Sequence, residues 1–223
     1  MGHRAEKQRR QREDIKANTV ALVRRQGADG LRVRDVVARS GISGATFFNY
    51  FEGKDAVLRE WLDDQIEAGF ERARIRHAKG AALRRVLRTL AREVAEAAVD
   101  DSRVVEAAAQ TVRFVSIREE SAAVALRGRL DGVSAAVQLI EESRHRGEVR
   151  ADLESAHVGS LLRAALLTAL VGAFRGASAP STGQLIPALR ASLDLMVDGL
   201  RKRNERIRAQ GSVRRAVSGP AGS

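Results

Sequence analysis

The sequence has 223 residues, enough for one large domain or two small ones, and 44% of them are hydrophobic. It contains no cysteine, which excludes disulfides, a thiolate nucleophile, iron–sulfur clusters and cysteine-based zinc sites. The longest apolar stretch, 161–174, contains Arg163 and is shorter than the roughly 18 residues that span a bilayer. The charged N-terminus lacks the apolar segment of a secretion signal. We therefore expect a cytoplasmic protein without membrane contact.

The net charge of +11 is concentrated at the two ends of the chain. Residues 1–54 carry 12 Lys and Arg against 6 Asp and Glu, residues 55–200 carry 20 against 21, and residues 201–223 carry 7 against 1. Basic ends around a neutral middle are expected where part of a protein faces a polyanion. Basic tails that only keep a protein soluble, or that bind nucleic acid without specificity, produce the same pattern.

The spacing of apolar residues predicts four helices in the first third of the chain. The first covers about 11–26 and ends at Gly27, and the second covers 33–40. The third is very short, with Ser43 as its N-cap and its end near residue 50. The fourth begins at residue 54 or 55 and carries an amphipathic stripe as far as Phe70.

The rest of the chain is predicted to be helical as well, because no period-2 alternation is long enough for a strand. Apolar periodicity predicts helices beginning at Leu83 and Val104, a long one over 119–146, an unusually apolar one over 155–174 and a last one from about 184 to 200. Together these segments predict an all-α fold of about nine helices.

Residues 32–51 have the features that a helix-turn-helix requires. Ala38 and Gly41 are small enough for the corner between the two helices, and Gly41 tolerates a positive φ. The second helix must show small or polar side chains to DNA, and Ile42, Phe47 and Phe51 are expected to face inward. Ser43, Gly44, Ala45, Thr46 and Asn49 are expected to face outward.

The stretch from residue 15 to 62, above all 33–58, resembles the N-terminal domain of the TetR family of transcriptional regulators. The resemblance lies in Val37-Ala38, Gly41-Ile42-Ser43, the run Ala45-Thr46-Phe47-Phe48-Asn49-Tyr50-Phe51, and Lys54. It implies a DNA-binding domain over 11–70 and a helical effector-binding and dimerisation domain over 71–204. A basic flexible arm, 1–10, is expected before them and a basic disordered tail, 205–223, after them.

The residues expected to contact DNA combine this resemblance with their chemistry. Thr46 carries a methyl group and a hydroxyl suited to thymine or phosphate, although a helical Thr also bonds its own backbone. Lys54 at the start of a helix suits a phosphate, or else is an ordinary surface lysine. The full set is Arg32, Arg34, Ser43, Gly44, Ala45, Thr46, Asn49, Tyr50 and Lys54.

Five basic side chains precede or begin the first predicted helix: Arg4, Lys7, Arg9, Arg10 and Arg12. They are expected either to remain unbound or to add contacts to phosphates or to a minor groove.

The resemblance further implies a homodimer and a small effector. The scarcity of aromatic residues favours an aliphatic-lined cavity and a lipophilic ligand. The two most C-terminal helices, 155–174 and 184–200, are the expected dimer surfaces and would form a four-helix bundle. Candidate effector-pocket residues are Phe70, Leu87, Leu90, Phe114 and Leu166. We expect no cofactor, no metal site among the scattered histidines, a surface position for His77, and no enzymatic activity.

The sequence therefore predicts a ligand-responsive repressor that binds a palindromic operator as a dimer. Two alternatives remain open: a helical protein that binds nucleic acid without specificity through its basic termini, and a helical enzyme with a hidden cavity.

Overall fold

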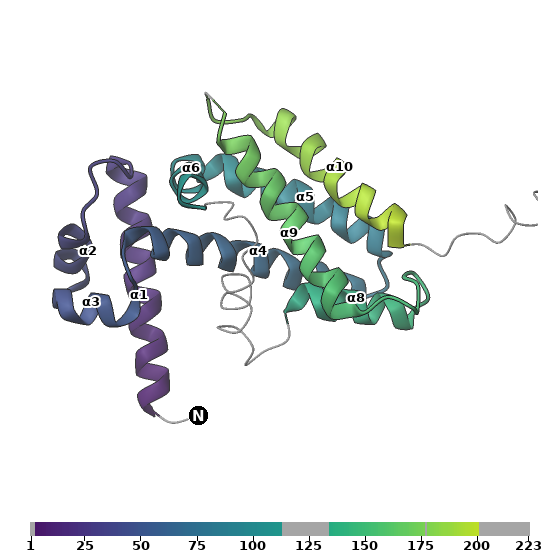
Figure 1. Ribbon diagram of the computed structural model, residues 1–223, viewed down its shortest axis with the longest axis horizontal. Helices are drawn as coiled ribbons and strands as arrows, with labels where there is room; N and C mark the ends of the chain where they lie inside the picture. The colour runs from purple at the N-terminus through teal and green to yellow at the C-terminus, as the bar shows by residue number, and fades with distance from the viewer. Residues whose placement is uncertain (1–2, 113–133, 177, 201–223) are drawn as a thin grey trace, which may run out of the picture.

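The computed structural model describes residues 3–112, 134–176 and 178–200. Over these ranges the chain forms nine helices and no strands, as predicted (Figure 1). Phe114, most of the predicted 119–146 helix and the predicted tail 205–223 lie outside the described residues.

The first three helices form a small N-terminal unit. α1 (His3–Gln26) runs beside α2 (Val33–Ser40) and α3 (Gly44–Tyr50), as Figure 1 shows. Ile15, Val36 and Phe47 are fully buried where these helices meet. Their burial fixes which face of each helix remains outside, because the apolar stripe of an amphipathic helix turns toward the core.

α4 (Lys54–Ala78) begins beside this unit and runs into the second, larger group of helices (Figure 1). There α5 (Leu83–Asp100) packs between α4 and α10 (Thr182–Leu200). α9 (Ser155–Phe174) packs against α8 (Ala135–His145), α10 and α6 (Ser102–Thr111). α4 is therefore the helix that the two parts of the molecule share.

The first helix begins earlier than predicted. α1 starts at His3, so the described residues of the expected flexible arm continue the helix. The physical reason lies in their composition, since this run contains neither Gly nor Pro and is rich in Arg, Lys, Gln and Glu, which are good helix formers.

The two parts are also joined at the far end of α1. Arg24 makes two hydrogen bonds to the Asp101 carboxylate, at 2.7 and 2.8 Å, and Arg103 donates to the Arg24 carbonyl at 3.3 Å. Asp101 lies at the corner between α5 and α6. The last turn of α1 is thus held by the corner of the second part.

His77, expected at the surface, is completely buried. Its Nε2 lies 2.9 Å from Glu148 Oε1 and 3.2 Å from Ser143 Oγ, and the other oxygen of Glu148 accepts from the Leu83 backbone N–H at 2.7 Å. The buried stripe of α4 runs through Phe70 and Ala73 to His77, so helical spacing places this histidine on the inner face. This cluster anchors the second end of α4.

α9 is long and apolar enough to cross a membrane by length and composition, although the apolar stretch 161–174 alone is too short. In the fold it packs among other helices, with Leu162, Leu166 and Leu170 buried. Its Arg163 makes ion pairs with Asp63 at 2.9 Å and Glu67 at 2.6 Å on α4. These contacts are those of a helix in a packed protein core.

Candidate nucleic-acid interface

The turn between α2 and α3 has the predicted geometry. Gly41 adopts φ 63° and ψ 33°, the left-handed conformation in which a residue with a Cβ is strained. Ser43 caps α3, because its Oγ accepts a hydrogen bond from the Thr46 N–H at 3.0 Å. The Thr46 hydroxyl lies 2.8 Å from the same oxygen, so it belongs to the cap and leaves the methyl group for other contacts.

α3 has one buried face and one exposed face. Phe47 is fully buried and Phe51, immediately after the helix, is 4% exposed. Gly44, Ala45 and Asn49 are exposed, as expected for a helix that presents small and polar groups. Their exposure makes this face the candidate for reading DNA bases.

The same face contains a residue that sequence reasoning missed. Phe48 is 59% exposed, and its ring packs edge-on against buried Phe47 with 5.4 Å between ring centroids and an interplanar angle of 89°. It lies three residues after Ala45, and this helical spacing was the signal that placed it on the exposed face. An exposed, fixed phenyl ring is suited to an apolar contact with a thymine methyl group.

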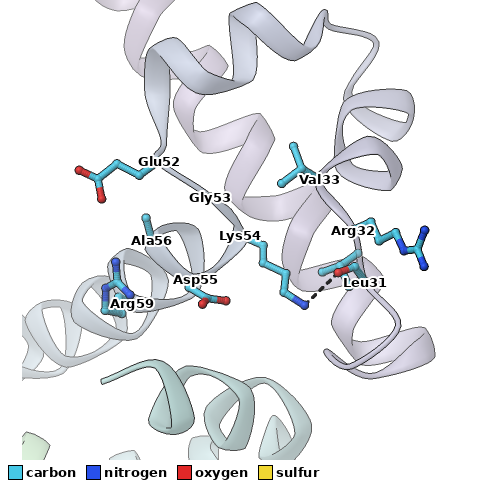
Figure 2. Close-up of a pocket in the computed structure, with 9 residues that line it drawn as sticks. All are labelled: Leu31, Arg32, Val33, Glu52, Gly53, Lys54, Asp55, Ala56 and Arg59. Atoms are coloured by element: carbon cyan, nitrogen blue, oxygen red, sulfur yellow. Dashed lines mark hydrogen bonds between the residues drawn. The ribbon is translucent and has the colours of Figure 1, made fainter. Parts of the chain in front are cut away.

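An open depression of about 470 Å³ lies where the first residues of α2 and α4 meet (Figure 2). Arg32 extends away from Lys54, and Arg59 belongs to the second turn of α4. The Arg32 backbone N–H is already bound by the Asp35 carboxylate at 2.9 Å. The lining of the depression carries the exposed guanidinium groups of Arg32 and Arg59 and also the exposed carboxylates of Glu52 and Asp55.

Lys54 has a structural role that the sequence did not reveal. Its Nζ donates to the Ala28 carbonyl at 2.7 Å and to the Leu31 carbonyl at 2.9 Å, as Figure 2 shows for Leu31. The ammonium group is half-buried and fastens the start of α4 to the connection between α1 and α2. A phosphate contact by Lys54 remains a prediction, and it would share the ammonium with these two carbonyls.

The remaining predicted DNA-contacting residues differ in how exposed their side chains are. Arg34 is exposed on α2, and among the described residues its one ion-pair partner is the distant Asp35 carboxylate at 3.9 Å. Tyr50 is half-buried and packs against the core. Its carbonyl accepts from Arg12 Nη1 at 2.7 Å. Arg34 is therefore available to a phosphate, whereas the ring of Tyr50 contributes to packing.

An ion network holds α1, α3 and α4 in fixed positions. The Arg12 guanidinium lies 4.2 Å from the centroid of the Phe51 ring and donates from Nε to Glu60 at 2.7 Å. Lys16, only 5% exposed, makes ion pairs with Glu60 at 3.3 Å and with Asp64. Arg12, which the sequence grouped with the arm, therefore belongs to the scaffold of the interface.

This network changes the acidity of Glu60. Burial alone would raise the pKa of the Glu60 carboxyl, but the Arg12 hydrogen bond and the charges of Arg12 and Lys16 outweigh it. The pKa of Glu60 is therefore held below its ordinary value.

Four of the candidate effector-pocket residues, Phe70, Leu87, Leu90 and Leu166, are at most 1% exposed. They lie in the packed core between α4, α5 and α9. None of them lines the depression beside Lys54, and their role as a pocket wall remains a prediction.

The exposed α3, its capped turn and the neighbouring cations define a helix-turn-helix protein with the geometry of a DNA-binding domain. Residues 15–61 match the family model described as bacterial regulatory proteins, tetR family. No curated protein matches the chain.

Several solved structures share the fold over nearly the whole chain. The Thermus thermophilus FadR, a TetR-family transcriptional repressor in complex with lauroyl-CoA, is 21% identical, with 95% of this chain and 100% of that chain covered and a TM-score of 0.66. A TetR-family transcriptional regulator from Pectobacterium atrosepticum is 18% identical, with 91% and 99% covered and a TM-score of 0.55. The fatty acid degradation regulator FadR from Bacillus halodurans is 15% identical, with 86% and 97% covered and a TM-score of 0.51.

The family match and the shared fold confirm the resemblance drawn from residues 33–58. Residues 15–61 thus form a tetR-family DNA-binding domain, and the chain as a whole shares the fold of the solved TetR-family regulators.

The lowered pKa of Glu60 predicts a pH-dependent contribution to stability. Glu60→Gln is expected to lower the free energy of unfolding at pH 7 by about 1 kcal/mol, the upper range for a partly exposed ion pair. Because the folded pKa lies below the unfolded one, the contribution is complete above about pH 5 and is lost as the pH falls through the folded pKa. Urea unfolding of both proteins between pH 7 and pH 3 measures it.

The control is Glu106→Gln, which removes an exposed carboxylate from α6. It is expected to change stability little at any pH. A Glu60→Gln deficit that stays constant down to pH 3 would contradict the assignment.

Proposed function

We propose that the protein is a sequence-specific repressor that binds a palindromic operator as a homodimer and releases it when a small lipophilic effector binds. The observation that carries the proposal is the exposed face of α3, where Ala45, Phe48 and Asn49 stand clear of the protein while Phe47 holds the helix from behind. A helix exposed in this way fits the major groove, which is about 12 Å wide.

Cations on both neighbours of α3 support the proposal. Arg32 and Arg34 are exposed on α2 and its cap, and Arg59 is exposed on α4. Phosphate contacts from two flanking helices position a reading helix in the groove, whereas contacts to base edges supply the specificity.

The outer faces of α9 and α10 support dimerisation. Leu195 is 76% exposed and Leu161 is 44% exposed. Exposed positions at helical spacing next to them are small, with Ala164 on α9 and Ala188 and Ala191 on α10. Two adjacent helices with exposed apolar and small side chains can pack closely on a second copy to form a four-helix bundle, which a C2 dimer provides.

The proposed effector site lies at the predicted residues Phe70, Leu87, Leu90 and Leu166. They lie on or against the second half of α4. Glu60, nearer the start of α4, is joined through Arg12 to the last residue of α3, so an effector that shifts α4 also shifts the reading helix. Their apolar side chains suit an acyl chain. One similar structure holds lauroyl-CoA, and another is a fatty acid degradation regulator. We therefore propose a long-chain acyl-CoA as the effector class.

DNA selection tests the central proposal. Duplexes recovered by the purified protein from a random library are expected to contain a palindrome, with half-sites about 34 Å apart or more. Binding titrations should give at least a ~10³-fold preference over scrambled duplex. Asn49→Ala should relax the preference at one base position by roughly 5- to 150-fold, the range for removing a single base-edge interaction.

Gln65→Ala, which truncates an exposed amide on α4, serves as the control and should bind as the unmodified protein does. Equal affinity for palindromic and scrambled duplexes with a steep salt dependence would instead support non-specific nucleic-acid binding.

Leu195→Glu tests the dimer. A carboxylate at the centre of the proposed interface should produce a monomer in sedimentation experiments and lower operator affinity at least tenfold, because a monomer binds only one half-site. Ile75→Glu is the matched control, since Ile75 is 42% exposed on α4, outside the proposed interface. A Leu195→Glu protein that remains dimeric would rule out this face.

Lauroyl-CoA tests the effector. Added at 100 times its dissociation constant, it should raise the free energy of unfolding by about 2.7 kcal/mol and release the operator in a mobility-shift assay. Free coenzyme A is the control and should do neither. Release by coenzyme A alone would show that the apolar core is not the effector site.

A further inference from the structure

The first eight described residues of α1 extend beyond the rest of the protein. Residues 3–10, here called the α1 extension, are all exposed, and burial begins only with the half-buried residues 11 and 12. At 1.5 Å per residue the extension projects about 12 Å. Figure 1 shows α1 continuing toward the N-terminus past α3, with no other helix of the described residues beside it.

The point from which the extension departs is fixed at one end of α3. Arg12 donates to the carbonyl of Tyr50, the last residue of α3, and packs over the ring of Phe51. Since α1 is one continuous helix from His3 to Gln26, the direction of the extension is set by the buried part of the same helix. The extension therefore stands in a fixed position beside the C-terminal end of the reading helix.

The extension is strongly cationic. It carries Arg4, Lys7, Arg9 and Arg10 against Glu6, and none of the four cations makes an ion pair or side-chain hydrogen bond that the structure shows with another described residue. Arg4 and Lys7, and then Lys7 and Arg10, are three residues apart, a spacing at which like charges destabilise a helix. A polyanion placed alongside would relieve this repulsion.

Resting on the proposed function, we infer that the α1 extension is a second DNA-contacting element, which binds the phosphates beside the bases read by α3. The helical form decides between the two contacts that the sequence left open. A helix with side chains is about 10–12 Å across, whereas the minor groove is about 6 Å wide, so the extension contacts the sugar-phosphate backbone from outside. Such contacts add affinity without adding sequence preference.

The test neutralises the extension by combining Arg4→Gln, Lys7→Gln, Arg9→Gln and Arg10→Gln. Glutamine keeps a good helix former at each position, and circular dichroism checks that helicity is retained. The matched control combines Lys79→Gln, Arg85→Gln, Arg92→Gln and Arg190→Gln, which removes three Arg and one Lys from exposed positions outside the helix-turn-helix unit. The two variants have the same net charge.

Affinity for the palindromic duplex selected by the unmodified protein is measured between 50 and 300 mM salt. Every phosphate that the variant no longer neutralises reduces the slope of log affinity against log salt by about 0.9, so two to four such phosphates reduce it by about 2 to 4. At 0.1 M salt this corresponds to an affinity roughly tenfold weaker for each phosphate. The extension variant should show this change and keep the same preferred sequence, and the control should show neither.

Equal slopes and affinities for the extension variant and the unmodified protein would overturn the inference. Equal loss of DNA affinity in the extension variant and the control variant would also overturn it, because the loss would then reflect net charge alone. These results leave the selected palindrome intact and are therefore distinct from failure of the proposed function. That failure would appear as absent sequence preference in the unmodified protein.

Discussion

α4 is held at both ends, and the placement of everything else depends on this constraint. At its start, Lys54 bonds two carbonyls of the connection between α1 and α2. At its far end, buried His77 contacts Glu148, which also binds the first residue of α5. A helix fastened in this way cannot move at one end without disturbing packed side chains or hydrogen bonds at the other.

This arrangement gives a physical basis for the proposed regulation by a ligand. The apolar core around Phe70 and Leu90 packs against the helix whose Glu60 is joined through Arg12 to the end of α3. A ligand can shift α4 only if it binds one position of the helix more tightly than another. Part of its binding free energy must offset the cost of separating side chains that are closely packed in its absence. The ion pairs of Glu60 with Arg12 and Lys16, together with the Arg12 bond to the Tyr50 carbonyl, couple the end of the reading helix to α4.

Local rules predicted the parts of the molecule that depend on neighbouring residues. The positive φ of Gly41, the cap at Ser43 and the bounds of the 33–40 and 155–174 helices follow from turn chemistry and apolar spacing. The partners of Lys54 did not, because Ala28 and Leu31 reach it only through tertiary folding.

Other features were within reach of the sequence but were interpreted wrongly or overlooked. Helical spacing already placed His77 on the buried stripe of α4, and a run without Gly or Pro already allowed α1 to begin at His3. The same spacing put Phe48 beside Ala45 on the open face of α3. The role of Arg12 was beyond prediction, since it depends on Glu60, far along the chain and on another helix.

The attachment of α1 at the α5–α6 corner lies far from the N-terminal end of the helix. Arg4 lies twenty helical steps from Arg24, which is held by Asp101, so about 30 Å of helix separates the two residues. A tilt of about 10° around that pivot would swing the free tip by about 5 Å, which is comparable to one turn of helix. Because Arg12 and Lys16 tie the same helix to the end of α3 and to α4, such a tilt would carry the reading helix with it and would not move the tip alone.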